Sequence, residues 1–214
     1  MNIKELLKTP LLSEIDKEVL ISFLDNKQIY ASSYKKGFTV HEQDEHCKTL
    51  DVVLSGSLVA YSLSQNGSKT VMFEFSNGGV LGANLLFSDS GIYPLSIYCL
   101  TDCRLLHITL DAVLELLKNH GFVMRYIKSL SQNSQGMNRK IAMFTQKSLR
   151  ENIMDYLTAQ IAKQHSKTIV LPVTKKQLAD YFGVQRPSLF RELKKLSDDG
   201  IITICNRKIT VNEH

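Results

Sequence analysis

The residues with the clearest chemistry lie near the C-terminus, where arginine and lysine recur along a predicted helix that begins near Arg186. At 100° per residue, its inward face is apolar and consists of Leu189, Leu193 and Leu196. Its outward face is polar or basic and holds Pro187, Ser188, Arg191, Lys194 and Lys195. Arginine can span O6 and N7 of guanine with two N–H donors, and lysine pairs with phosphate. The pattern therefore predicts a helix that packs on its leucines and presents cations to nucleic acid.

A second predicted helix precedes this one and must position it. Thr174 and Gln177 have the spacing of a capping box, and Pro172 favours extended chain before the cap. Ala179 is small enough to let two helices approach closely. Gly183 ends the helix, because glycine can adopt the left-handed conformation of a sharp turn.

A predicted hairpin follows the basic helix. Two β-prone runs, residues 201–204 and 208–211, flank Cys205-Asn206-Arg207. Helix, turn, helix and hairpin in this order are typical of a winged helix-turn-helix, which places its second helix in the major groove of DNA. The alternative is another small domain in which Lys and Arg only cover a solvated face. We expect DNA contacts from Thr174, Lys175, Lys176, Gln185, Arg186, Ser188, Arg191, Lys195 and Arg207.

Charge is uneven along the chain, which has a formal net charge of +5. Residues 147–214 hold 12 Lys or Arg against 7 Asp or Glu, whereas residues 1–146 hold 14 of each. The whole positive excess therefore lies in the segment with the predicted helix-turn-helix, as expected of a nucleic-acid-binding module.

Composition excludes several other classes of protein. The chain has 214 residues, 43% hydrophobic and 22% charged, which is ordinary for a globular protein. No apolar run reaches the roughly 18 residues of a membrane span, and the charged N-terminus lacks the apolar core of a signal peptide. Four scattered cysteines do not make a disulfide scaffold. We therefore expect a cytoplasmic protein with no membrane partner.

Short β-prone runs separated by glycine or polar turns fill residues 28–108. Many short strands at close spacing predict a β-barrel or jelly roll, and Asn66-Gly67 predicts a tight hairpin within it. Residues 1–25 are predicted to be helical. Their apolar set is Leu6, Leu7, Leu11, Leu12, Ile15, Val19 and Leu20.

A long helix is predicted to begin near Phe122. Alternating steps of three and four along it define a seam, as in a helix that pairs with its own copy. The seam consists of Ile127, Leu130, Ser134, Met137, Ile141 and Phe144. The alternative is a helix that packs on its own barrel. Pairing suits a DNA reader, because two recognition helices then fit major-groove turns about 34 Å apart. A candidate hinge at residues 144–147 precedes a further amphipathic helix over 148–165.

This order of elements resembles the Crp/Fnr family of bacterial transcription regulators over essentially the whole chain. ADYFGVQRPSLFRELKKLSDDGII is similar to the family's helix-turn-helix signature, and LSGSLVAYSL and GGVLGANLLF are similar to its barrel motifs. NLLFSDSGIYPLSIY resembles a subgroup common in Firmicutes whose effectors are mostly unassigned.

The resemblance implies an α+β fold with three parts. They are a cyclic-nucleotide-binding-like barrel or jelly roll over residues 1–120, a dimerisation helix and hinge over 121–146, and a winged helix-turn-helix over 147–214. It also implies a homodimer on a palindromic DNA operator, with an effector bound in the barrel and RNA polymerase as a further partner.

Family roles carry over to the basic helix one residue at a time. Arg186 and Arg191 match the family's two recognition-helix arginines. Pro187 stands where the best-known members have a glutamate that accepts a hydrogen bond from cytosine, so the preferred operator should differ at that base pair. Phe190 is bulky where a small residue is common. It could touch a thymine methyl group, but we expect it to pack inward.

The effector site departs further from the family pattern. Gly82 is followed by Ala83 where cyclic-nucleotide binders have Gly-Glu, and residues 93–97 supply no arginine for the phosphate. A buried cyclic phosphate without a cation would be poorly compensated. We therefore expect an effector other than cyclic AMP. We also expect no iron–sulfur cluster, because the N-terminal region has no group of cysteines. The predicted pocket consists of Tyr61, Met72, Gly82, Ala83, Asn84, Leu85, Tyr93, Ser96 and Tyr126.

Cysteines and histidines of the barrel leave two interpretations open. Cys99 and Cys103 flank a predicted turn, with Cys47, His41 and His107 in the same segment. They could form a redox pair or ligate metal or haem, but small thiols also fill β cores, which we favour. We therefore expect no cofactor and no metal. A regulator without effector, or one tuned by cysteine redox, is the alternative function. The His-x-His spacing of a cupin-like enzyme is absent.

Overall fold

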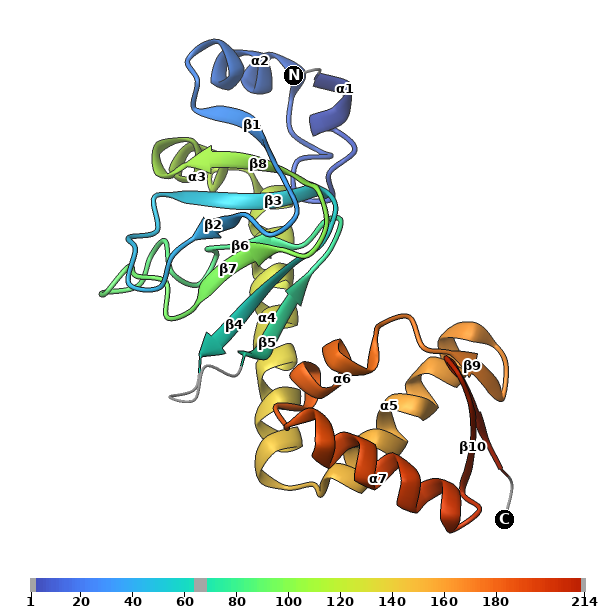
Figure 1. Cartoon of the computed structure of the whole chain (residues 1–214). Helices are drawn as coiled ribbons and strands as arrows, with labels where there is room; N and C mark the ends of the chain where they lie inside the picture. The colour runs from blue at the N-terminus through green and yellow to red at the C-terminus, as the bar shows by residue number, and fades with distance from the viewer. Residues whose placement is uncertain (1–2, 64–68, 213–214) are drawn as a thin grey trace. The chain divides into compact units, whose positions relative to one another are not determined.

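The structure is a computed structural model that describes residues 3–63 and 69–212. The chain divides into two units, one formed by residues 1–62 and 72–137 and the other by residues 138–214 and 63–71. Figure 1 labels the elements of both units. Among the described residues, no helix combines the length and the apolar sequence that crossing a membrane requires.

The N-terminal segment is less helical than its sequence predicts. α1 spans Ile3–Leu6 and α2 spans Lys17–Asp25, and turns occupy the residues between them. Pro10 lies among these turns, where it has no N–H to donate to a helix. Val19 of the apolar set is 39% exposed. The buried members of the predicted set are Leu6, Leu11, Leu12, Ile15 and Leu20.

Two four-stranded sheets contain the strands between residues 29 and 109, in agreement with the predicted barrel or jelly roll. The first sheet has the order β1 (Ile29–Tyr34), β8 (Cys103–Thr109), β3 (Thr49–Ser55) and β6 (Val80–Leu81). The second has the order β2 (Thr39–His41), β7 (Ser96–Cys99), β4 (Leu58–Leu63) and β5 (Lys69–Phe75). The predicted Asn66-Gly67 turn lies outside the described residues.

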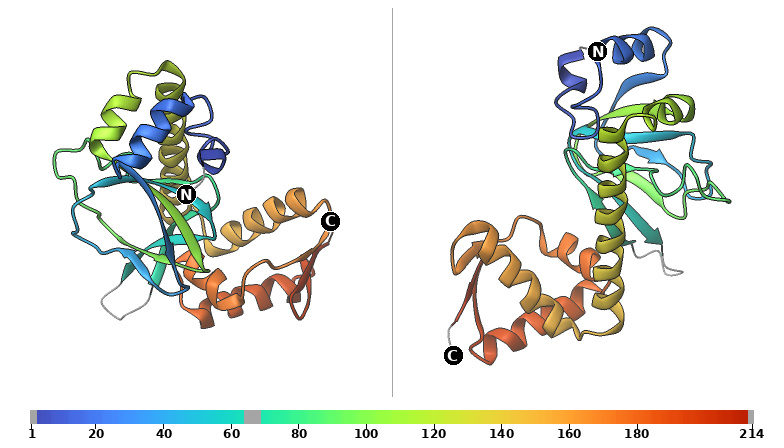
Figure 2. Two further views of the ribbon diagram at one scale, coloured as in Figure 1. Left: turned by 90° about the horizontal axis from the view of Figure 1, so that it is seen from above. Right: turned by 180° about the vertical axis from the view of Figure 1, so that it is seen from behind.

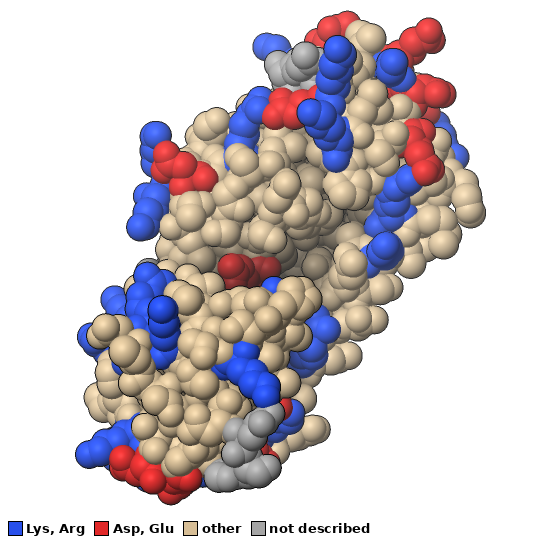
Figure 3. Space-filling view, turned by 90° about the vertical axis from the view of Figure 1, so that its right-hand side faces the viewer, with Lys and Arg blue, Asp and Glu red and all other residues tan. Residues whose placement is uncertain are grey.

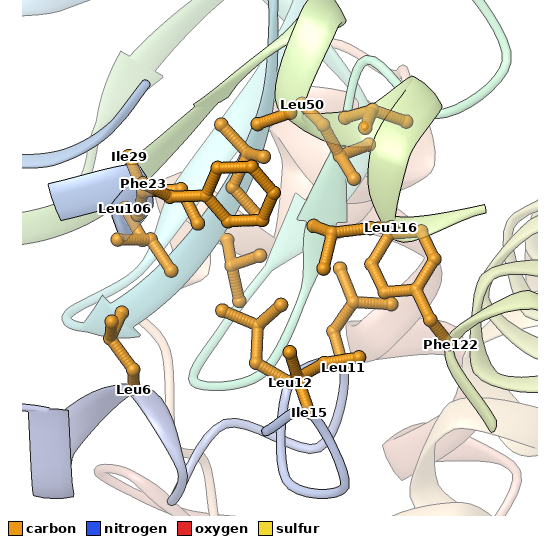
Figure 4. Close-up of a cluster of buried hydrophobic side chains, with 14 of the residues drawn as sticks. Leu6, Leu11, Leu12, Ile15, Phe23, Ile29, Leu50, Leu106, Leu116 and Phe122 are labelled. Atoms are coloured by element: carbon orange, nitrogen blue, oxygen red, sulfur yellow. The ribbon is translucent and has the colours of Figure 1, made fainter. Parts of the chain in front are cut away.

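Strands β3 and β8 are buried on both faces. Their successive side chains point to opposite faces and so belong to two different clusters. Leu50, Val52 and Leu106 belong to a cluster with α2, with α3 (Leu110–Leu116) and with the start of α4 (His120–Thr145). Figure 4 shows Leu50 and Leu106 grouped with Phe23, Leu116 and Phe122. The alternate residues of β3 and β8, among them Val53 and Leu105, belong to a cluster with residues of the second sheet. Side chains on that second face are therefore enclosed between the sheets.

α4 is one uninterrupted helix, visible as such in the right-hand view of Figure 2. It begins at His120, close to the predicted start, and Gly136 does not break it. Its first turns pack on the barrel through the buried Phe122 and Tyr126.

The second unit has the predicted helix-turn-helix with one strand more than expected. Its helices are α5 (Leu149–Gln164), α6 (Lys175–Phe182) and α7 (Arg186–Asp198). Its sheet has the order β10 (Ile202–Cys205), β11 (Lys208–Val211) and β9 (Thr168–Val170). The predicted wing was a two-stranded hairpin. β9 extends it, since Ile169 pairs with Ile209 and both are fully buried.

Candidate functional site

The turn between α6 and α7 is built by the residues that predicted it. Thr174 Oγ1 accepts a hydrogen bond from the Gln177 N–H at 3.2 Å, and Gln177 Oε1 accepts one from the Thr174 N–H at 2.9 Å. Gly183 then adopts a φ of +64°, which side chains with a Cβ rarely adopt. The cap and the glycine together fix where α6 ends and where α7 can begin.

α7 separates an apolar side from a basic side as predicted. Leu189, Leu193 and Leu196 are 0%, 2% and 0% exposed. They pack in one cluster with Leu178, Ala179 and Phe182 of α6. The exposed residues of α7 and its N-cap are Gln185, Arg186, Pro187, Phe190, Arg191, Lys194, Lys195 and, at the end of the helix, Asp198; Ser188 is partly buried. The exposed cations therefore lie on a helix whose opposite side is buried against α6.

Several predicted DNA-binding side chains already have partners within the protein. Arg191 Nη2 lies 3.4 Å from Ser188 Oγ, and Lys195 Nζ lies 3.8 Å from a Glu192 carboxylate oxygen. Arg207 donates from Nη2 to the carbonyl oxygen of Leu171 at 2.8 Å. This bond ties the turn of the wing to the segment before α6, a role that the sequence did not predict. A guanidinium has five N–H donors, so Arg207 keeps others for a second partner.

Phe190 does not pack inward, so that expectation is wrong. It lies at the edge of the leucine side of α7 and is 37% exposed. Two cations face its ring instead. Lys175 Nζ lies 5.2 Å from the ring centroid and Arg186 Cζ lies 5.3 Å from it.

The remaining predicted contacts lie around the same helices. Lys176 and Thr174 are exposed at the start of α6, and Lys175 is partly buried beside Phe190. Figure 3 shows Lys and Arg at several places over the unit that holds α5–α7, with an acidic group at its lower edge. Within this unit Asp199 pairs with Arg150, with Oδ2 2.6 Å from Nη2.

The predicted seam of α4 is largely exposed in the single chain. Ile127, Met137 and Ile141 are 49%, 43% and 52% exposed, and Ser134 is exposed as well. Leu130 differs, since it is partly buried against the barrel core. The Phe144 side chain lies outside the described part of the chain.

The predicted effector residues fall into two groups rather than one open pocket. The first group consists of Gly82, Ala83, Tyr93 and Tyr126. The Tyr126 hydroxyl donates to the Ala83 carbonyl at 2.6 Å, and the Tyr93 hydroxyl lies 3.5 Å from Cys47 Sγ. Tyr93 is 1% exposed, so it is a core side chain and not an open pocket wall. Gly82 has a φ of +78°, and a Cβ there would come within 2.9 Å of Cys47 Sγ.

The second group lies on the other sheet. Tyr61 of β4 stands opposite Ser96 of β7, and Met72 is on the neighbouring strand β5. Ser96 Oγ accepts from the Gln43 N–H at 3.0 Å. Of the remaining predicted residues, Asn84 is exposed, and Leu85 packs against the cluster between the sheets.

A cavity of about 310 Å³ opens elsewhere on this unit. None of the predicted effector residues lines it. Its lining includes Tyr34, Lys35, Asp102 and Arg104. Lys35 pairs with Asp102 at 2.8 Å and Arg104 pairs with Glu5, so both cations there already have counter-charges.

The sequence missed a buried polar network between the two sheets. Asp51 of β3 is 0% exposed. His41 Nε2 donates to its Oδ2 at 2.6 Å, and His107 Nδ1 donates to its Oδ1 at 2.8 Å. Thr49 Oγ1 donates to Oδ1 at 2.7 Å, and the Tyr34 hydroxyl lies 3.0 Å from His107 Nε2. The network joins the first sheet to the second, because His41 belongs to β2.

Asp51 is held as a carboxylate by this network. Burial alone would raise its pKa, but the hydrogen bonds from His107 and His41 outweigh burial and lower the pKa below its usual value. His41 stacks on Tyr93 with ring centroids 4.2 Å apart. Its Nδ1 has no hydrogen-bond partner in the described part of the chain, and Glu45 Oε1 lies 3.8 Å away. A lone carboxylate within the apolar run Leu50–Leu54 was the sequence signal that could have indicated such partners.

The histidines and cysteines of the barrel were the candidates for metal binding or redox chemistry. Across residues 3–63 and 69–212, no three His, Cys, Asp or Glu side chains are arranged to hold a metal ion. Cys99 and Cys103 are buried and unpaired by disulfide. Burial, together with a hydrogen bond to Cys103, raises the pKa of Cys99 to about 12. A thiol with so high a pKa has little reactive thiolate at neutral pH.

Comparison with known proteins matches both units. Residues 31–120 match the cyclic nucleotide-binding domain, and residues 152–214 match the Crp-like helix-turn-helix domain. The chain is 22% identical over 195 residues to the cAMP-activated global transcriptional regulator CRP of Salmonella typhimurium. The alignment covers 88% of this chain and 91% of that protein.

Solved structures show the same fold. The c-di-GMP responsive global regulator CLP of Xanthomonas campestris superposes with a TM-score of 0.74 at 20% identity, over 93% of this chain and 100% of that one. A putative regulator of the crp/fnr family from Eubacterium rectale superposes with a TM-score of 0.69 at 19% identity, over 95% and 94% of the two chains.

Proposed function

This chain belongs to the Crp/Fnr family of DNA-binding transcription regulators, and we propose that it acts as a homodimer that binds a pseudopalindromic operator under the control of a small molecule other than cyclic AMP. The family consists of regulators rather than enzymes. The observation that carries the proposal is the exposed basic side of α7, supported by a fully buried leucine side. The N-terminal half of such a helix is the part that enters a major groove.

Base and backbone contacts divide along this surface. Arg186 and Arg191 are exposed near the start of α7, where each can take a guanine through O6 and N7. Pro187 between them offers no side-chain acceptor for cytosine. The backbone contacts fall to the surrounding polar and basic residues Thr174, Lys175, Lys176, Gln185, Ser188, Lys195 and Arg207.

The exposed seam of α4 supports the homodimer. Ile127, Met137 and Ile141 leave apolar surface on one stripe of a helix of 26 residues. A second copy that covers this stripe would bury that surface and create the two-fold axis that a palindromic operator requires. RNA polymerase is the further partner expected of such a regulator at a promoter.

We propose that residues 1–120 bind the effector that controls DNA binding. Residues 121–146 then form the dimer helix and hinge, and residues 147–214 form the DNA-binding part. The Salmonella relative is named as cAMP-activated and the Xanthomonas structure as c-di-GMP responsive, so the fold by itself does not specify the effector. Ala83 and the absence of arginine from residues 93–97 argue against a cyclic phosphate here. Cys99, with its raised pKa, does not favour the redox-tuned alternative.

Selection from a randomised DNA duplex tests the proposal directly. We expect the full-length protein to enrich a sequence with two inverted half-sites. The logarithm of its binding constant should fall linearly with the logarithm of salt concentration. Adding cyclic AMP should leave that affinity unchanged. Recovery of no preferred sequence would overturn the operator, and a clear rise with cyclic AMP would overturn our interpretation of Ala83.

Sedimentation of two charge-matched variants tests the dimer. Ile141→Glu places a carboxylate in the seam and should convert the dimer to a monomer. Gln132→Glu adds the same charge on the exposed opposite side of α4 and should leave the dimer intact. A dimer that survives in Ile141→Glu would contradict the seam.

A further inference from the structure

Phe190 is an exposed aromatic side chain in the middle of a cationic surface. It is 37% exposed, while Leu189 next to it is fully buried. It takes no part in the hydrophobic cluster that holds α6 and α7 together, as far as that cluster is described. The buried packing between the two helices therefore does not include this ring.

Two cations from different helices hold the ring. Arg186 is one helical turn before Phe190 on α7, and Lys175 comes from the first turn of α6. Their cationic groups lie 5.3 Å and 5.2 Å from the ring, within the range of cation–π attraction. Both cations are among the proposed DNA contacts. A surface that brings them to DNA must bring the ring as well.

Position along α7 points to base edges rather than to the sugar–phosphate backbone. Arg186 and Arg191 are the two arginines proposed to read guanine. Phe190 follows the first by four residues and immediately precedes the second. A phenyl ring can make no hydrogen bond with a phosphate. In the major groove the apolar group that a base presents is the C5-methyl of thymine.

We propose that Phe190 is a specificity-determining residue that selects thymine through contact with its C5-methyl group, at a base pair beside those read by Arg186 and Arg191. This inference rests on the proposed binding of an operator. Desolvating one methyl group should change affinity roughly fourfold, which corresponds to about 0.8 kcal/mol.

Deoxyuridine substitution isolates that methyl group, because it removes the methyl and leaves the hydrogen-bonding edges unchanged. The operator is first selected by the full-length protein from a randomised duplex. Each thymine in it is then replaced by deoxyuridine, symmetrically in both half-sites, and affinity is measured at fixed salt. Wild type should lose roughly fourfold per contact at one thymine position in each half-site. Phe190→Ala should bind the unmodified operator more weakly and show no further loss when that thymine is replaced.

Lys194→Ala is the matched control, since Lys194 is exposed one turn further along the same side of α7. It removes a cation and keeps the ring, so the loss at the deoxyuridine position should persist. Equal deoxyuridine effects in wild type and Phe190→Ala at every thymine would overturn the inference. So would equal losses of Phe190→Ala on operator and random DNA. Failure to select any sequence would instead reject the operator itself.

Discussion

The DNA-facing helices and the interior of the barrel obtain their order in different ways. Around α6 and α7, each determining contact is local: Thr174 and Gln177 are three residues apart, and Gly183 ends the helix that they begin. Inside the barrel, Asp51 meets partners that are 10 and 56 residues away in the sequence. Local contacts can be predicted from spacing, whereas the barrel network exists only after two sheets have packed.

The two regions also differ in what a substitution should disturb. The basic side of α7 is exposed and contributes little to folding, so its loss should affect binding. The network at Asp51 touches no proposed DNA contact and is buried, so its loss should affect stability. Four measurements test whether binding and stability are separated in this way.

Asp51→Ala should have the largest effect. It leaves the buried N–H groups of His41 and His107 without their acceptor, and removing one partner of a buried ionic network costs about 3–5 kcal/mol. The measurement is denaturant unfolding of the full chain. Asp89→Ala removes an exposed carboxylate and should cost less than about 0.5 kcal/mol. Similar losses in both variants would mean that the network contributes no more than a surface acid.

Acid should remove the same contribution in the wild type. Because the folded-state pKa of Asp51 lies below its ordinary value of 3.8, its stabilisation is fully present above that value. It is lost as pH falls through the depressed folded-state pKa. The difference in unfolding free energy between wild type and Asp51→Asn should therefore be constant near neutrality and shrink below about pH 4. A difference that grows as pH falls would contradict the ionised carboxylate.

Arg191→Ala should show the opposite behaviour, with binding lost and stability kept. Loss of a bidentate guanine contact should cost about 1–3 kcal/mol on the selected operator and much less on random DNA. Its hydrogen bond to Ser188 is long, at 3.4 Å, and exposed, so unfolding should be nearly unchanged. An equal loss on both DNAs would show that Arg191 touches only phosphate.

The fold itself followed from sequence wherever periodicity was long or a cap was present. α7 was predicted with its buried and exposed sides, and α5 and α6 with their limits. Prediction was wrong where a short apolar pattern suits more than one structure. The leucines of residues 6–20 occur at helical spacing, yet turns around Pro10 bury most of them equally well. β9 has three residues, too few for an alternation to be detected.

Candidate sites were harder to predict, because exposure and partners depend on the packed chain. Phe190 lies at the edge of the helical face, where a small rotation decides between core and surface. The sequence could place it on either side. Asp51 was detectable only as an unexplained charge in a buried run, and the identity of its partners required the register of β3 with β8 and the packing of β2 across them.

Thr174→Ala should give the smallest effect and tests whether local signals really determine the DNA-facing helices. The substitution removes the Oγ1 acceptor of the Gln177 N–H, and loss of an N-cap costs about 1 kcal/mol. Thr174→Ser keeps the oxygen and should cost only a few tenths of that. Because α6 carries Lys175 against Phe190, fraying of its first turn should also weaken operator binding slightly. If Ala and Ser variants unfold alike, α6 is held by its buried Leu178, Ala179 and Phe182 alone, and the helix-turn-helix depends on tertiary packing as much as the barrel does.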